Sequence, residues 1–110
     1  MYLLGIDIGT SAVKGGLFNR QGHAERMEAA EYGMEQPCNG WAEQSPEVWW
    51  QAVKQVIRKL IAHDGAIAKQ IAAVGLSGQM HGLVMMDSQG NVLRPCILWC
   101  DGRSGEECRE

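Results

Sequence analysis

The sequence has little positive charge and no long apolar run. Its 10 lysine and arginine residues are outnumbered by 13 aspartate and glutamate residues, which gives a net charge of −3. With no basic stripe or RNA-binding signature either, we expect no nucleic-acid partner. The longest apolar stretches fall far short of the roughly 20 residues that span a bilayer, so we expect no membrane association. Asp7 interrupts the N-terminal apolar run and no cationic leader precedes it, which predicts that there is no signal peptide.

Cysteine pairs of the Cys-x-x-Cys type are also absent. The four cysteines are Cys38, Cys96, Cys100 and Cys108, and none has the spacing of a zinc site or a thioredoxin-like motif. Cys96 and Cys100 are one helical turn apart, but the apolar residues between them favour a strand. We therefore expect buried, reduced thiols in a cytoplasmic protein.

The composition is that of a soluble globular domain. The chain has 110 residues, of which 45% are hydrophobic and 21% are charged. This is enough for a modest core, and the chain is one domain at most. Internal repeats and low-complexity segments are absent, so the remaining signals are local motifs.

Residues 5–18 carry the most informative motif. Apolar residues predict strands over 2–8 and 12–18, joined by a Gly-Thr-Ser turn as a β-hairpin. A carboxylate at Asp7, at the end of a buried strand, requires a cation or hydrogen-bond donors to compensate it. Thr10 and Ser11 offer hydroxyl groups and Lys14 offers a positive charge, which together suit Mg²⁺ and nucleotide phosphates. The alternative is that Asp7 only forms the turn; the spacing of a Walker-type loop is absent.

The rest of the chain predicts further strands around one long helix. A third strand is expected over 23–32, and the adjacent Gly15 and Gly16 predict close approach of a helix or ligand. Ser45 and Pro46 are typical of a helix start, and an apolar stripe at helical spacing runs from Trp49 to Ile61. A buried strand is expected over 71–77, and further strands are expected over 83–87, 92–93 and 97–99. A helix is expected to start at 101–104. These elements predict an α/β domain with a mixed sheet, an antiparallel three-stranded meander at its start, and one long helix packed on the sheet.

A second polar motif lies between two predicted strands, at residues 77–82. Its glycines allow a sharp turn, from which Gln79 and His81 present polar side chains. A histidine and a glutamine near a strand end suit a polyhydroxylated substrate, with Met80 packing against its carbon chain. The alternative is a tight turn that carries a surface histidine.

Four segments together resemble the N-terminal part of the xylulokinases in the FGGY family of carbohydrate kinases. In the order of that family they are residues 5–11 with Lys14, residues 40–50, residues 75–82 and residues 93–103. The resemblance implies a partial ribonuclease H-like fold of the actin and hexokinase type. It also implies that residues 1–110 are the N-terminal part of kinase domain I, with the remainder of that domain and all of domain II absent.

The resemblance further implies ATP-dependent phosphorylation of D-xylulose to D-xylulose 5-phosphate. Asp7 would help to hold the Mg²⁺ of MgATP, directly or through water, and Thr10, Ser11 and Lys14 would contact the β- and γ-phosphates. Met80 and His81 match the sugar-binding pair of the family, and Trp99 matches a residue that lines the sugar cleft. The full-length parent is expected to be a cytoplasmic enzyme and a candidate homodimer.

Three points of the resemblance stay open. Asp101 and Arg103 match positions that we interpret as structural, and Cys100 departs from the polar residue, often Asn, of similar sequences. The general base that accepts the proton of the sugar hydroxyl corresponds to an Asp far beyond residue 110. The chain alone is therefore expected to be an inactive module with at most weak ligand binding. Another FGGY kinase, acting on gluconate, fuculose or ribulose, is the alternative for the parent; glycerol kinases generally place Arg-Glu where Met80 and His81 stand.

Overall fold

The fold comes from a computed structural model that describes residues 1–109. These residues divide into two compact units. The first contains residues 1–32 and 49–79, and the second contains residues 33–48 and 80–109. Each unit is described by itself. No helix in the described part of the chain has both the length and the apolar character needed to cross a membrane.

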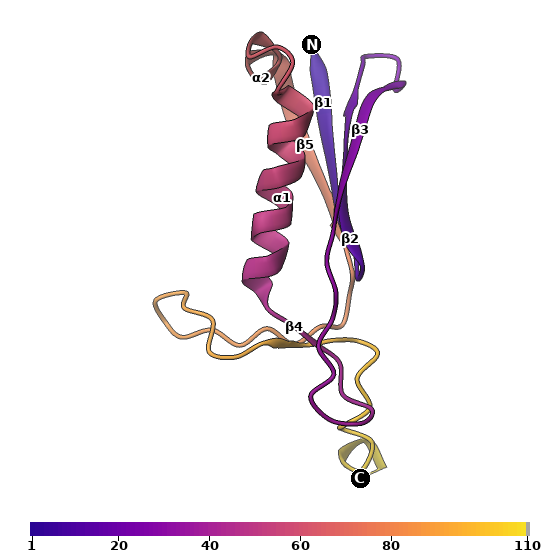
Figure 1. The fold of residues 1–110 in the computed structure, drawn as a ribbon, viewed down its shortest axis with the longest axis vertical. Helices are drawn as coiled ribbons and strands as arrows, with labels where there is room; N and C mark the ends of the chain where they lie inside the picture. The colour runs from indigo at the N-terminus through magenta and orange to yellow at the C-terminus, as the bar shows by residue number, and fades with distance from the viewer. Residues whose placement is uncertain (110) are drawn as a thin grey trace. The chain divides into compact units, whose positions relative to one another are not determined.

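The first unit is built on a four-stranded mixed sheet with the strand order β3-β2-β1-β5. Strands β1 (Tyr2–Ile8), β2 (Ala12–Phe18) and β3 (Ala24–Glu31) form an antiparallel meander, and β5 (Ile71–Gly78) lies parallel to β1. Figure 1 shows the strands side by side, with the long helix α1 along one face. The predicted meander, mixed sheet and single long helix are confirmed.

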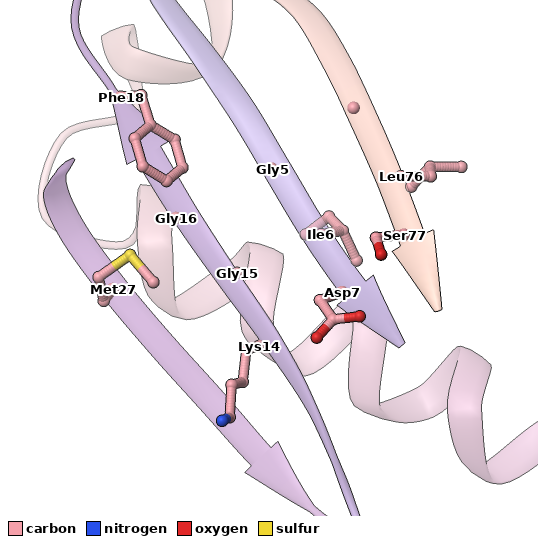
Figure 2. A pocket seen from close by; sticks show the side chains of 11 residues that line it. Gly5, Ile6, Asp7, Lys14, Gly15, Gly16, Phe18, Met27, Leu76 and Ser77 are labelled. Carbon is pink, nitrogen blue, oxygen red and sulfur yellow. The ribbon is translucent and has the colours of Figure 1, made fainter. Parts of the chain in front are cut away.

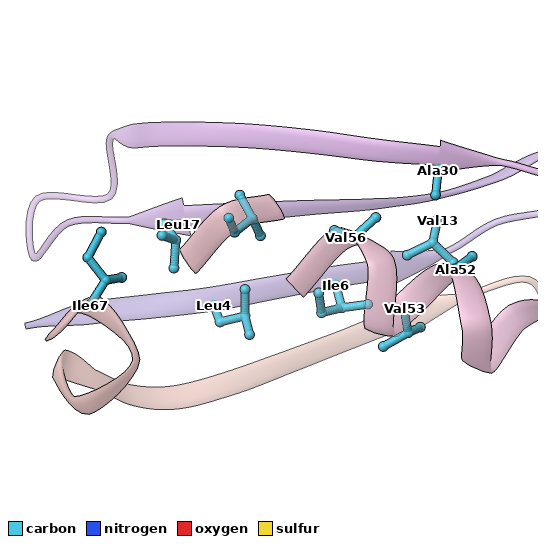
Figure 3. Close-up of a cluster of buried hydrophobic side chains, with 10 residues drawn as sticks. Leu4, Ile6, Val13, Leu17, Ala30, Ala52, Val53, Val56 and Ile67 are labelled. Atoms are coloured by element: carbon cyan, nitrogen blue, oxygen red, sulfur yellow. The ribbon is translucent and has the colours of Figure 1, made fainter. Parts of the chain in front are cut away.

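Helix α1 (Pro46–Ile61) covers the sheet with an apolar stripe. It begins at Pro46, directly after Ser45, as the sequence predicts. Alternate residues of β1 and β2 point toward this helix and form the core with it, because successive side chains of a strand face opposite sides of the sheet. Figure 3 shows the resulting cluster. Its buried members are Leu4, Ile6, Val13, Leu17, Ala30, Ala52, Val53, Val56, Leu60 and Ile67.

Gly15 allows α1 to lie directly against β2. A Cβ atom at this position would lie 2.5 Å from Val56 Cγ1 and 3.2 Å from Leu60 Cδ1, so any larger residue would push the helix away from the sheet. At Gly16, on the other face of β2, the neighbours are the side chains of Met27 and Phe18. The close approach predicted for this glycine pair is confirmed: helix α1 packs directly against Gly15.

Three details of the first unit differ from the sequence prediction. Helix α2 (Ala66–Gln70) was not expected; it follows Asp64, whose carboxylate accepts a hydrogen bond of 2.8 Å from the Ala66 backbone N–H. Strand β5 is present but not buried, because it lies at the edge of the sheet. Val74 and Leu76 are 57% and 75% exposed. Strand β3 is one residue shorter at each end than expected.

The second unit is held by short pairings rather than by a large sheet. Strand β4 (Glu43–Gln44) pairs antiparallel with β6 (Cys96–Ile97), and single bridges connect Glu35 to Glu43 and Leu83 to Ile97. The strands predicted over 83–87 and 92–93 are therefore wrong, because these segments contain only isolated bridges. The strand predicted over 97–99 is replaced by β6, which ends at Ile97, and by a turn. The apolar residues of 83–87 and 92–93 match the pattern of a strand, but these residues form a loop.

Two further expectations for this part of the chain need correction. The helix expected from 101–104 is replaced by turns and by a short 3₁₀ helix, η1 (Glu107–Arg109); the remainder of that expectation falls on residue 110, outside the described residues. Only Cys96 is a buried thiol, and burial raises its pKa. Cys38 and Cys100 are exposed in loops and turns, and Cys108 is exposed on the short helix η1.

Candidate nucleotide and sugar sites

Asp7 and Lys14 lie directly opposite each other in the β1–β2 hairpin. Their Cα atoms are partners in the antiparallel register, and Ser77 of β5 is the partner of Asp7 on its other side. Paired residues of neighbouring strands place their side chains on the same face of a sheet. The three polar side chains therefore form a row across β2, β1 and β5, on the face opposite α1.

This polar row lines one end of an open groove of about 440 Å³. Figure 2 shows Asp7, Lys14 and Ser77 close to one another, with Phe18 and Met27 farther along the same face. The floor between them is backbone, because Gly5 is paired with Gly16 on one side and with Gly75 on the other. The groove thus offers a charged end and an apolar end to a ligand.

The environment of Asp7 differs from the one expected from the sequence. The side chain is exposed rather than buried, because it lies on the face of the sheet that α1 does not cover. A burial penalty therefore does not act on this carboxylate. Within residues 1–109, neither Asp7 nor Lys14 takes part in an ion pair. Both charges are available to a ligand in the groove.

These residues fit a magnesium ion that a nucleotide brings with it. Protein-bound Mg²⁺ usually keeps several waters and takes only one or two carboxylates in addition to phosphate oxygens. No cluster of three metal-binding side chains occurs in the described residues, so a site built from protein ligands alone is not supported there. The site offers the groups that a metal-bound phosphate needs: the exposed carboxylate of Asp7, the hydroxyl of Ser77 and the facing ammonium of Lys14.

The tip of the hairpin is fixed from one side by Tyr32. Its backbone N–H donates a hydrogen bond of 2.9 Å to the Ser11 carbonyl, and its hydroxyl donates to the Gly9 carbonyl. Partial burial, followed by the negative charge of Asp7, raises the pKa of this hydroxyl. Tyr32 therefore remains a hydrogen-bond donor at neutral pH and holds the turn that carries Thr10 and Ser11.

Gln79 fixes the other side of the same turn. Its backbone N–H donates to the Ile8 carbonyl at 2.9 Å, and its side-chain oxygen Oε1 accepts a hydrogen bond of 3.1 Å from Thr10 Oγ1. The sequence predicted that Gln79 would present its side chain to a substrate beside His81. The structure instead places that side chain on the hairpin, because β5 is parallel to β1 and ends beside the turn.

The expected sugar-binding residues belong to the second unit. Met80 and Trp99 are 71% and 56% exposed. His81 is exposed and has a φ of 63°, and it is the one residue other than glycine with a positive φ between residues 1 and 109. Left-handed backbone is uncommon for such residues, and it is enriched at functional sites. The backbone bends at His81, although Ser77 and Gly78 of the predicted turn belong to β5, and the contact of His81 with a sugar stays a prediction.

A charged cluster, which we call the Glu43 cluster, organises this unit. Glu43 is 6% exposed, and its Oε1 lies 2.6 Å from Arg94 Nη2 and 2.8 Å from Arg103 Nη2. Arg103 also contacts Asp101, with 2.7 Å between Nη2 and Oδ2, and its guanidinium lies 3.7 Å from the centre of the Trp41 ring. Two of the four motif segments, 40–50 and 93–103, are joined by these contacts.

Asp101 connects the same cluster to the backbone. Its Oδ2 accepts a hydrogen bond of 2.6 Å from the Ala42 N–H, and its Oδ1 accepts one of 2.9 Å from the Arg103 N–H. Hydrogen bonding to the Arg103 guanidinium, with these backbone donors, holds the pKa of Asp101 well below its usual range. Asp101 in turn raises the pKa of Arg103. These contacts support the interpretation that Asp101 and Arg103 are structural residues.

The structure thus brings together one group of expected residues and leaves the other in a separate unit. Asp7, Thr10, Ser11 and Lys14 lie on one hairpin in the first unit, whereas the expected sugar residues lie in the second. Sequence reasoning missed Tyr32, whose position depends on long-range pairing. It also missed Glu43, which lies in the motif segment 40–50 and whose role depends on the pairing of β4 with β6, where Glu43 is the partner of Ile97.

Comparison with known proteins now assigns the family. The model of the N-terminal domain of the FGGY family of carbohydrate kinases matches residues 2–110. The chain belongs to the FGGY family of carbohydrate kinases. Among curated FGGY relatives, the xylulose kinase of Escherichia coli strain K12 is 44% identical over 108 residues, and that of Klebsiella pneumoniae is 43% identical over 109 residues. The matches cover 98% and 99% of this chain.

The structural comparison agrees with the sequence comparison. A crystal structure described as a "xyloylose kinase" from Brucella ovis superimposes with a TM-score of 0.94 and 39% sequence identity, over 99% of this FGGY chain and 23% of that one. The predicted actin and hexokinase type of fold is therefore confirmed. The chain spans about 22% of the length of the two curated relatives.

Proposed function

We propose that this chain is the N-terminal part of domain I of an FGGY kinase that phosphorylates D-xylulose with ATP. The observation that carries this proposal is the row formed by Asp7, Lys14 and Ser77 at the charged end of the groove. The identity of 43–44% with xylulose kinases supports D-xylulose as the sugar. Gluconate, fuculose and ribulose are the alternative substrates to be tested beside it.

On the nucleotide side, each proposed role follows from the position of the residue. Asp7 holds the Mg²⁺ of MgATP, directly or through water, while Lys14 neutralises phosphate charge from the adjacent strand. Thr10 and Ser11 contact the β- and γ-phosphates from the turn that Tyr32 and Gln79 hold. When bound, Mg²⁺ supplies charge neutralisation to the transferring phosphoryl group, for which positioning and electrostatics provide most of the catalysis.

On the sugar side, we propose that Met80 packs against the carbon chain, His81 hydrogen-bonds a hydroxyl, and Trp99 lines the cleft. All three side chains are exposed, so they are accessible to a ligand. Cys100 is exposed beside Trp99 and is proposed to affect sugar preference, because a thiol is a weaker hydrogen-bonding group than a carboxamide.

We propose that the general base of the reaction lies in sequence outside these residues, because the curated relatives are several times longer than the match. The isolated chain then binds ligand weakly at most and does not turn over. A sugar-dependent release of ADP by the isolated chain, measured in a coupled assay, would contradict this part of the proposal.

A chimera tests the proposed activity directly. Residues 2–109 replace the matching segment of the E. coli xylulose kinase, and ADP release is measured with D-xylulose and with a panel of other sugars. We expect turnover with D-xylulose. In this chimera, Asp7→Asn should lower kcat by about a hundredfold or more, the effect typical of losing one transition-state contact.

The matched control is Asp64→Asn, which changes the same side chain in an exposed turn and leaves an oxygen for the Ala66 N–H. It should leave kcat unchanged. An Asp7→Asn variant with kcat near that of the unmodified chimera would show that the proposed metal role is wrong.

A further inference from the structure

We propose that Gln79 is a positioning residue for the nucleotide-binding turn and not a sugar contact. The inference rests on the proposed kinase function and deepens it. It concerns a residue that directly precedes Met80 and His81 in the chain, where sequence reasoning places it with the sugar. The structure places its side chain on Thr10 instead.

Two hydrogen bonds fix Gln79 to the hairpin. The bond from its backbone N–H to the Ile8 carbonyl extends the β1–β5 pairing by one step, which sets the direction in which the side chain leaves the strand. The side-chain oxygen then reaches Thr10 Oγ1, 69 residues away in sequence, at 3.1 Å. Both residues are half-buried, so water competes only in part for this contact.

The contact complements that of Tyr32. Tyr32 holds the backbone of the turn through the carbonyls of Gly9 and Ser11. Gln79 holds the hydroxyl of Thr10, which fixes the rotamer of a side chain proposed to contact phosphate. Groups that act in catalysis must be held within about 0.5 Å of their productive position, and neighbouring residues that lock their rotamers provide this accuracy.

A positioning role and a sugar contact predict opposite kinetic effects. If Gln79 acts through Thr10, Gln79→Ala in the chimera should raise KM for ATP about three- to tenfold, the range expected for one lost hydrogen bond, and leave KM for D-xylulose within twofold. A rise in KM for D-xylulose with KM for ATP unchanged would overturn the inference. Gln55→Ala, at an exposed position of α1, is the matched control and should change neither constant.

A double-mutant cycle tests whether the effect passes through Thr10. Thr10→Val removes the hydroxyl and keeps the branched shape. In that background Gln79→Ala should have almost no further effect on KM for ATP, because the hydrogen bond is already lost. Fully additive effects would show that Gln79 acts by another route and would overturn the inference.

A measurement without nucleotide separates this inference from the proposed function. In the 110-residue chain, three-bond couplings measured by NMR should report one χ1 rotamer of Thr10, and Gln79→Ala should produce averaging over several rotamers. Averaging in the unmodified chain, or an unchanged rotamer in the variant, would overturn the positioning role whatever the chimera does. A chimera that fails to use ATP, with the couplings as expected, would reject the kinase proposal and leave the hydrogen-bond contact established.

Discussion

The two units of this chain are stabilised by different interactions. The first unit buries ten apolar residues, which come from the sheet, α1 and α2. In the described part of the second unit the buried apolar residues are Ala42, Cys96 and Leu98, and its two buried polar residues are Glu43 and Gln44. The first unit therefore depends on apolar area, and the second depends on ion pairs and on hydrogen bonds to loops.

This difference matches the chemistry proposed for each unit. Of the proposed nucleotide residues, Asp7 and Lys14 lie on paired strands, which hold side chains accurately, and Thr10 and Ser11 lie in the short turn between these strands. The expected sugar residues lie in loops, which vary more readily and carry specificity in many enzymes. The comparison indicates that charge changes and acid affect the second unit first, whereas truncation of apolar side chains affects the first.

Truncation in the core of the first unit should have the largest effect. Leu60 is fully buried against the sheet, and Leu60→Ala should lower the free energy of unfolding by about 2–5 kcal/mol. Urea unfolding followed by circular dichroism measures this loss. Leu93→Ala, which truncates a leucine that is 60% exposed in the second unit, is the matched control and should cost much less. Equal effects would contradict the division into two kinds of stabilisation.

Removal of the charge at the centre of the Glu43 cluster should have the next largest effect. Glu43→Gln keeps the shape of the side chain but removes the attraction to Arg94 and Arg103. We expect a loss of about 1–3 kcal/mol, the usual cost of leaving a buried partner poorly satisfied. Hydrogen exchange should speed up at residues 96–98 while the sheet of the first unit stays protected. Faster exchange in both units alike would show that they are not separate in stability.

A change at His81 should affect the sugar and not the nucleotide. In the chimera, His81→Asn should raise KM for D-xylulose about tenfold, equivalent to about 1.4 kcal/mol, and leave KM for ATP unchanged. Asparagine is chosen because it tolerates the left-handed backbone at this position, so that the loss of the imidazole is tested without added strain. An unchanged KM for D-xylulose would return His81 to the role of a turn residue.

Acid should produce the smallest effect and should act on the second unit. Because the pKa of Asp101 is lower in the folded chain than in the unfolded chain, its stabilising contribution is complete above the unfolded value of about 3.9. That contribution is lost progressively as the pH falls below about 4 toward the depressed folded pKa. Amide NMR signals at residues 40–43 and 98–103 should report this loss before those of β1 and β2.

Asp101→Asn is the control for this acid effect. It should remove most of the pH dependence of the second unit below pH 4. A weaker dependence should remain, since hydrogen bonds from Asn91 and its neighbours also lower the pKa of Asp87 in the same unit. If the Asn variant keeps the full dependence, Asp101 is not its source.

The sequence predicted the fold best where its local patterns are long. The bounds of β1 and β2 and the start of α1 agree with the structure, because each has a continuous apolar pattern and a recognisable turn or cap. Strand β4 has two residues and α2 has five, too few to show a period. The apolar residues at 83–87 have the composition of a strand, but only long-range pairing decides that they do not form one.

The candidate site shows the same limit. A hairpin brings Asp7 and Lys14 together by local geometry, so their pairing was predictable. The positions of Ser77 and Gln79 depend on the pairing of β5 with β1, and the local sequence does not predict which strand pairs with β1. Its neighbours in sequence therefore predict a sugar contact for Gln79, whereas its side chain contacts Thr10 of the first hairpin.

The left-handed backbone at His81 also limits how this protein can be redesigned. Glycine, asparagine and aspartate adopt such a conformation at little cost, whereas β-branched residues do so rarely. Most of the other residues at position 81 will therefore add backbone strain, of about 1–2 kcal/mol each. Met80 and Trp99, which are also proposed to contact the sugar, are exposed and have no positive φ, so substitutions there add no such backbone strain.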